Sequence, residues 1–204
     1  MNKKIFYRIL LLFFSCSIWF GTQKLIGKKD IPNKNIINDQ IIESSFITNA
    51  NIWLKNNLLF LRWYIILSSL SIDLSVLYIF IIFIKYGKRS ILECKIIKIL
   101  IATLLCRQIN QLITSLPKPI GKYWEYPGFP SLFVSYNVSN DMFFSGHTSI
   151  STIMAYYLWK KKLPSLSLIY FFLNTSMIIF TKGHYFMDIY TAIITSSYWI
   201  LFFS

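Results

Sequence analysis

The chain has 204 residues, of which 55% are hydrophobic and 14% are charged, with 21 Lys and Arg against 8 Asp and Glu. An average soluble domain is about 25% charged, and a disordered chain lacks bulky apolar residues, so both classes are excluded. Long apolar runs separate the basic clusters, which argues against a nucleic-acid partner and predicts an integral membrane protein with positive loops.

The apolar runs predict an all-α integral membrane bundle of about six transmembrane helices, which forms a single domain over residues 1–204. A span needs about 20 apolar residues. Pro117 and Pro119 end the third run, because proline lacks the N–H that a helix requires. The predicted spans, in chain order, are residues 5–25, 58–85, 91–116, 143–159, 163–180 and 184–203.

The polar segment between the first two spans predicts an interfacial helix in its second half. Ile41, Ile42 and Phe46 fall there at helical spacing. Such a helix lies in the membrane plane, with its apolar side chains at the headgroup boundary.

Basic residues at the span ends predict the orientation of the bundle. Lys and Arg accumulate in short cytoplasmic loops, and the short loops on the N-terminal side carry more of them. The first long polar segment is an exception. We therefore expect cytosolic N- and C-termini and an active site on the non-cytosolic face. The loop cations on the first side are Lys85, Lys88, Arg89, Lys95, Lys98, Lys160, Lys161 and Lys162, against Lys118, Lys122 and Lys182 on the other.

The two histidines each open a predicted span at the same membrane depth. His184 and Asp188 are four residues apart, so on one helix their side chains share a face. A carboxylate there fixes the imidazole tautomer and makes the other ring nitrogen a better nucleophile or base. The alternative is a polar pair that only satisfies itself.

His147 follows two small residues at a predicted helix start. Ser145 is a candidate N-cap, and Gly146 leaves the first amides open to an anion. A phosphate bound there would meet His147 as a proton donor. The stretch alone fits an ordinary capped helix, but with His184 and Asp188 it predicts phosphoryl chemistry without a metal or cofactor.

Three stretches resemble a known family when they are read together. Asp141–Thr148 (DMFFSGHT) and His184–Asp188 (HYFMD) resemble the two signature motifs of the sphingomyelin synthase family. This family is a branch of the lipid phosphate phosphatase (type 2 phosphatidic acid phosphatase) superfamily. Arg107, followed by Thr114–Pro117 (TSLP) and Pro119, resembles its third motif in order and spacing.

The resemblance implies a role for each matching residue. His184, oriented by Asp188, attacks the lipid phosphorus and forms a phosphohistidine-type intermediate. His147 protonates the leaving alcohol and then activates the acceptor, while Asp141 orients or charge-balances the site. Glu125 matches a further acidic residue of the family only loosely.

The chain also departs from the family pattern. Phosphatase relatives carry an Arg where this chain has Ile178, and Lys182 is the candidate to supply the positive charge. The family's proline-rich first motif is matched only weakly, by Pro32 and Asp39. Arg107 has two readings, as a phosphate clamp or as the partner of Asp73 in the preceding span. Tyr123, Trp124 and Tyr126 are read as an aromatic belt or as a choline cage.

These observations predict a membrane enzyme that transfers a phospho-headgroup from a phospholipid donor to a lipid-alcohol acceptor. A hydrolase that uses water at the same site, such as a lipid phosphate phosphatase, is the first alternative. A non-catalytic membrane scaffold or transporter is the second.

Overall fold

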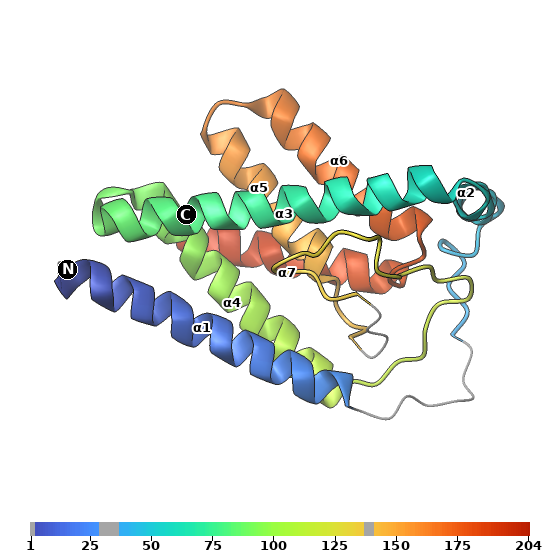
Figure 1. Cartoon of the computed structure of the whole chain (residues 1–204), viewed down its shortest axis with the longest axis horizontal. Coiled ribbons are helices and arrows are strands. Elements are labelled where there is room, and N and C mark those ends of the chain that lie inside the picture. Colours follow the sequence, from blue (N-terminus) through green and yellow to red (C-terminus); the bar gives the residue numbers. More distant parts are fainter. Residues whose placement is uncertain (1–2, 29–36, 137–140) are drawn as a thin grey trace.

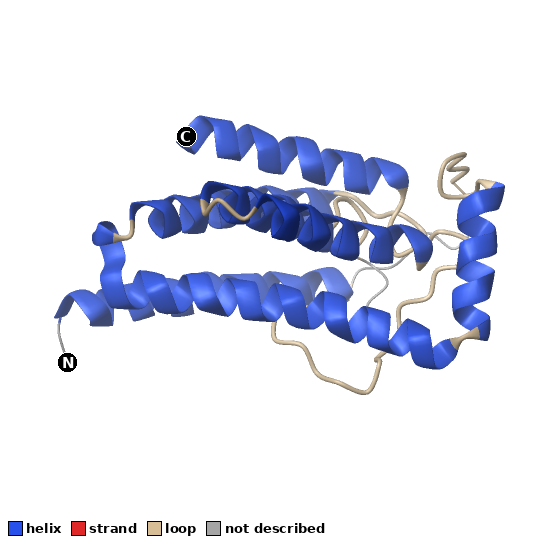
Figure 2. Cartoon of the chain, turned by 90° about the horizontal axis from the view of Figure 1, so that it is seen from above, coloured by secondary structure: helices blue, strands red, loops and turns tan. Residues whose placement is uncertain are grey.

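The computed structural model describes residues 3–28, 37–136 and 141–204, and this part of the chain is helical and contains no strand. Figure 1 shows the helices as a bundle, and Figure 2 shows that α2 runs across one end of it. The helices are α1 (Lys3–Gly27), α2 (Ser45–Asn56), α3 (Leu58–Tyr86), α4 (Ile91–Ile113), α5 (Gly146–Lys160), α6 (Pro164–Phe180) and α7 (Phe186–Phe203), with a short 3₁₀ turn at Gly87–Arg89.

Within the described ranges, four helices are long and apolar enough to cross a membrane: α1, α3, α4 and α7. Their exposed surface is rich in large apolar side chains, and α1 buries only Leu12 and Ile26 of its 25 residues. This distribution suits a bundle whose outer surface faces lipid rather than water. The all-α membrane bundle expected from the sequence is confirmed.

The two remaining predicted spans form a tight hairpin of α5 and α6. They have 15 and 17 residues, and at 1.5 Å per residue they are about 23 and 26 Å long. A hydrocarbon core is about 30 Å thick. All six predicted spans are therefore helices, but α5 and α6 are shorter than a typical crossing.

Five predicted span boundaries differ from the helix ends by two or three residues: α1 extends two residues beyond the first predicted span at each end, and three further boundaries lie near the histidines. The third span stops at Ile113 rather than residue 116, because the backbone of Thr114 is extended. The fourth begins at Gly146 rather than residue 143, because Ser145 is its N-cap in an extended conformation. The sixth begins at Phe186 rather than residue 184, so His184 precedes the helix.

The helix expected in the second half of the first polar segment is α2, which starts later than predicted. Phe46 lies in its first turn and is exposed, whereas Ile41 and Ile42 precede it in a turn. Asn51 of α2 donates to the backbone carbonyl of Phe180 at 2.8 Å, which attaches α2 to the end of α6. Pro32, which the sequence matched weakly to the family's first motif, lies outside the described residues.

The two described ends of the chain lie at the same end of the bundle. Arg8 Nη1 donates to the carbonyl of Ile84 at 2.9 Å, and Lys95 Nζ donates to the carbonyl of Ser204 at 3.0 Å. We call this the termini end. The N-terminal ends of α5 and α7 and the C-terminal end of α4 lie at the opposite end, which we call the histidine end (Figure 1).

Candidate functional site

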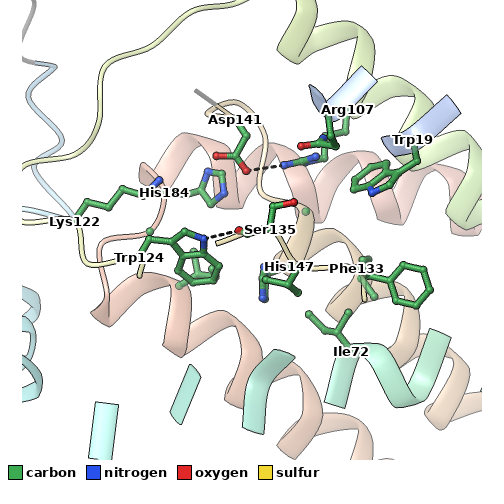
Figure 3. A pocket seen from close by; sticks show the side chains of 16 residues that line it. Trp19, Ile72, Arg107, Lys122, Trp124, Phe133, Ser135, Asp141, His147 and His184 are labelled. Carbon is green, nitrogen blue, oxygen red and sulfur yellow. Dashed lines mark hydrogen bonds and ion pairs between the residues drawn. The ribbon is translucent and has the colours of Figure 1, made fainter. Parts of the chain in front are cut away.

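A polar pocket lies at the histidine end, and both histidines line it (Figure 3). Its volume is about 40 Å³. One water needs about 10–15 Å³ of such space, so the pocket holds roughly three waters or one small polar group. Of the residues to which the sequence gave a catalytic, supporting or phosphate-binding role, five line it: Arg107, Asp141, Gly146, His147 and His184.

His184 and Asp188 form the pair expected from their spacing. His184 Nδ1 lies 2.9 Å from Asp188 Oδ2, and both side chains are buried. The expected geometry is corrected in one respect, because His184 lies in the turn before α7 and only Asp188 is helical. Asp188 sits in the first turn of α7, where its Oδ2 also accepts the backbone N–H of Tyr185 at 3.3 Å. This arrangement fixes the carboxylate, and the carboxylate in turn orients the imidazole.

The segment before α5 is tied directly to the start of α7. The backbone N–H of Ser145 donates to the carbonyl of Asp188 at 3.2 Å. Ser145 is the N-cap that the sequence predicted, since its Oγ accepts the N–H of Thr148 at 3.3 Å. The two histidine-bearing segments are therefore held together by backbone contacts and do not depend on a ligand.

His147 is buried at the start of α5 and presents an unpaired nitrogen. Trp124 packs edge-on against its ring, with the ring centroids 5.2 Å apart. Nε2 of His147 has no hydrogen-bond partner among the described residues. Buried polar atoms are normally paired, so an unpaired one in a pocket wall marks a place for a ligand atom.

Arg107 reaches the pocket from the last turns of α4 and is held on two sides. Its Nε donates to the carbonyl of Phe144 at 2.9 Å, and Nη2 lies 3.3 Å from Asp141 Oδ2. Nη1 is buried and has no partner among the described residues. A Cβ on Gly146 would lie 3.1 Å from Arg107 Nε, so glycine is what permits this approach. One edge of the guanidinium is thus fixed and one nitrogen remains for an oxyanion.

Asp73 is not the partner of Arg107, which excludes one of the two readings of that arginine. Asp73 instead accepts from Ser131 Oγ and from the N–H of Leu132, both at 2.9 Å, and from the N–H of Phe133 at 3.1 Å. A buried carboxylate with three donors is well satisfied. It anchors the loop before α5 to the middle of α3.

Lys122 lies in the pocket wall and was only a loop cation in the sequence. Burial would raise the pKa of Asp141, but Lys122 and Arg107 outweigh it and lower that pKa below its ordinary value of 3.8. Burial also lowers the pKa of Lys122, although the Asp141 carboxylate opposes this effect. Arg107 and Lys122 both interact with the carboxylates of Asp141 and Asp188, so these four charges balance, and the unpaired Nη1 of Arg107 is the group suited to an anion.

Lys182 and Glu125 do not line the pocket. Lys182 Nζ donates to Thr48 Oγ1 of α2 at 3.0 Å, and burial lowers the pKa of this lysine. Glu125 is exposed, and its charge raises the pKa of the neighbouring Tyr123 in addition to the effect of burial. The sequence offered Lys182 as the cation of the site. The structure instead places Lys122 in the pocket wall.

Asp39 is a further residue near the site that the sequence marked only weakly. Its Oδ2 accepts the backbone N–H of Phe186, the first residue of α7, at 2.6 Å. Its Oδ1 accepts the N–H groups of Ile41 and Ile42. The carboxylate thus joins the first polar segment to the helix start that carries Asp188, where a negative charge is favourable. Asp39 and Phe186 lie far apart in the sequence, so no local sequence pattern predicts this contact.

No group of three or more His, Cys, Asp and Glu side chains in the described part of the chain is arranged to hold a metal ion. The sequence matches no protein-family model and no curated protein.

Proposed function

We propose that this protein is a membrane phosphotransferase that moves a phospho-headgroup from a phospholipid to a lipid alcohol. The observation that carries the proposal is His184 Nδ1 fixed by Asp188 at 2.9 Å in a pocket that His147 also lines. An imidazole whose tautomer is fixed in this way is an activated nucleophile. The motif resemblance to sphingomyelin synthases supports the same chemistry.

The reaction proceeds in two displacements. In the first, the Nε2 lone pair of His184 forms a bond to phosphorus, and the bond from phosphorus to the donor lipid oxygen breaks. His147, as imidazolium, gives its proton to that oxygen and releases diacylglycerol. In the second, neutral His147 takes the proton of the acceptor alcohol, whose oxygen attacks phosphorus and frees His184.

Arg107 and Lys122 supply the electrostatic part of the proposed reaction. Charge builds up on the non-bridging phosphate oxygens as the displacement proceeds, and fixed donors stabilise it most when they need no reorganisation. Arg107 Nη1 is such a donor, because Phe144 and Asp141 already fix the guanidinium. The small pocket suits a phosphate group while the rest of the lipid stays outside it.

The test is a transfer assay with the purified chain in lipid nanodiscs. Phosphatidylcholine or phosphatidylethanolamine with a labelled headgroup is supplied with and without ceramide. We expect label in a ceramide phospho-headgroup product, together with diacylglycerol. No turnover of any lipid phosphate would remove the enzyme proposal and leave the scaffold or transporter alternative. The matched control is the Glu93→Gln variant, which changes a buried polar group far from the pocket.

A hydrolase is the second candidate, because it would use the same two histidines. In the second displacement, water would take the place of the acceptor alcohol. The same assay separates the two, because hydrolysis gives phosphocholine, phosphoethanolamine or free phosphate at a rate that does not depend on ceramide.

A further inference from the structure

A second cavity lies next to the polar pocket and is almost entirely apolar. Its volume is about 240 Å³, and α1, α3 and α4 supply most of its wall. It is distinct from the polar pocket, but Trp19, Phe133 and Ile150 line both. A group bound in the polar pocket and a chain bound in the apolar cavity are therefore separated by only a few side chains.

One polar side chain in the apolar wall is unsatisfied. Gln108 is 4% exposed, and neither its Oε1 nor its Nε2 has a hydrogen-bond partner among the described residues. Leaving a buried amide unpaired is costly, and a cavity wall is where a ligand can pair it. Gln108 directly follows Arg107 in α4, so the amide lies at the level of the proposed phosphate clamp.

The length of the cavity matches one leaflet of a bilayer. Its wall follows α4 from Ile97 to Gln108. At 1.5 Å per residue these positions are about 16 Å apart along the helix, close to half of the roughly 30 Å hydrocarbon core. An apolar cavity of about 150 Å³ holds a benzene molecule, so this one has room for a single hydrocarbon chain but not for two.

We infer that this cavity binds one hydrocarbon chain of the lipid substrate, and that Gln108 recognises the ester or amide linkage at the top of that chain. The amide N–H of Gln108 donates to the linkage carbonyl of the phospholipid donor. A diacyl lipid has no hydroxyl or amide N–H beside this carbonyl, so it pairs Nε2 of Gln108 and leaves Oε1 unpaired. The inference rests on the proposed function, because it assigns the chain to the lipid whose phosphate occupies the polar pocket.

Chain-positioned photocrosslinking tests this assignment. The full chain carrying His184→Ala, which leaves the probe intact, is placed in nanodiscs with phospholipids that carry a diazirine either near the carbonyl or at the chain end. We expect the first probe to label the segments around Trp19 and Gln108, and the second to label those around Leu12 and Ile97. Uniform labelling of lipid-facing positions by both probes would overturn the inference.

Two variants with a matched control make the test independent of folding defects. Leu104→Trp places a bulky ring in the cavity wall, and we expect it to lower labelling about tenfold. Ile109→Trp is the control, because Ile109 is exposed on the same helix and lies outside the cavity. Equal labelling in both variants contradicts a chain in the cavity.

Gln108→Leu should raise the stability of the protein but weaken probe binding, a combination that is not expected from a purely structural residue. We expect the lipid-free protein to melt at a higher temperature, since two unpaired buried atoms are removed, and the probe to bind about fivefold more weakly. Lower stability with unchanged probe binding would show that Gln108 has an ordinary packing role. Cavity labelling without turnover in the parent protein would contradict the proposed transferase activity but support the chain-binding site. Turnover without cavity labelling would support the transferase activity but contradict the chain-binding site.

Discussion

The interface between α4 and α5 carries a buried polar cluster at each end, and the two clusters differ in how completely they are paired. At the termini end, Glu93 accepts from the Tyr157 hydroxyl at 2.9 Å and from Lys161 Nζ at 2.8 Å. At the histidine end, Arg107 makes comparable contacts to the segment before α5. Yet the polar cluster around the pocket leaves three buried atoms without partners among the described residues: Arg107 Nη1, His147 Nε2 and Asp188 Oδ1.

The difference separates a structural cluster from a candidate site. Both ends hold the same two elements together, so helix packing does not require unpaired atoms. Each unsatisfied buried polar group costs about 1–3 kcal/mol. Unpaired buried atoms also occur elsewhere among the described residues, but those of Arg107 and His147 border a pocket, which supports the proposal that the site lies at the histidine end.

The largest effect is expected from His184→Ala. Removing the proposed nucleophile should lower turnover by about 10⁴-fold or more, because no other group forms the covalent intermediate. The protein should remain membrane-inserted and monodisperse on size exclusion. Labelled phospholipid turnover measures the effect, and a substantial residual rate would reject His184 as the nucleophile.

Arg107→Lys should have the next largest effect. Lysine keeps the charge but cannot bond Phe144 and Asp141 while also offering a fixed third donor. Loss of one positioned oxyanion donor predicts a fall in turnover of about 10²-fold. Initial rates at saturating lipid measure this fall in turnover. A variant as active as the parent protein would contradict the role of Arg107 as a phosphate clamp.

Glu93→Gln, at the termini end, should lower stability without lowering turnover. Glutamine still accepts from Tyr157 but loses the ion pair with Lys161, which is 41% exposed and therefore partly screened. We expect the free energy of unfolding to fall by about 1 kcal/mol while turnover per folded molecule stays unchanged. Thermal unfolding and the transfer assay, measured on one preparation, check this. A loss of turnover larger than the loss of folded protein would break the distinction between the two ends.

The smallest effect is expected from Gly146→Ala. The added methyl would lie 3.1 Å from Arg107 Nε and would displace the guanidinium slightly, which predicts a fall in turnover of about threefold. Gly21→Ala is the control, because a Cβ on that helical glycine meets no atom within 4 Å. Identical rates for the two variants would mean that the contact with Arg107 has no influence on the reaction.

Local features of the site could be predicted from the sequence because they depend on short separations. The capping role of Ser145 and the pairing of His184 with Asp188 follow from residues three and four positions apart. The helical character of the apolar runs follows from their length and composition. The start of α7 was placed two residues early, since hydrophobicity does not show that the chain turns at His184 before the helix begins.

Contacts between distant segments were decided only by the tertiary structure. The sequence offered Arg107 a phosphate or Asp73 as its partner, and only the fold shows that it pairs with Asp141 while Asp73 holds the loop at residues 131–133. The fold likewise brings Lys122 into the pocket and takes Lys182 to α2. By itself the sequence determined a helical membrane bundle with the two histidines at or just before helix starts, because the length and spacing of apolar and polar residues along the chain are local features. Which cations and carboxylates meet depends on how helices and long polar segments pack, and no local pattern encodes that.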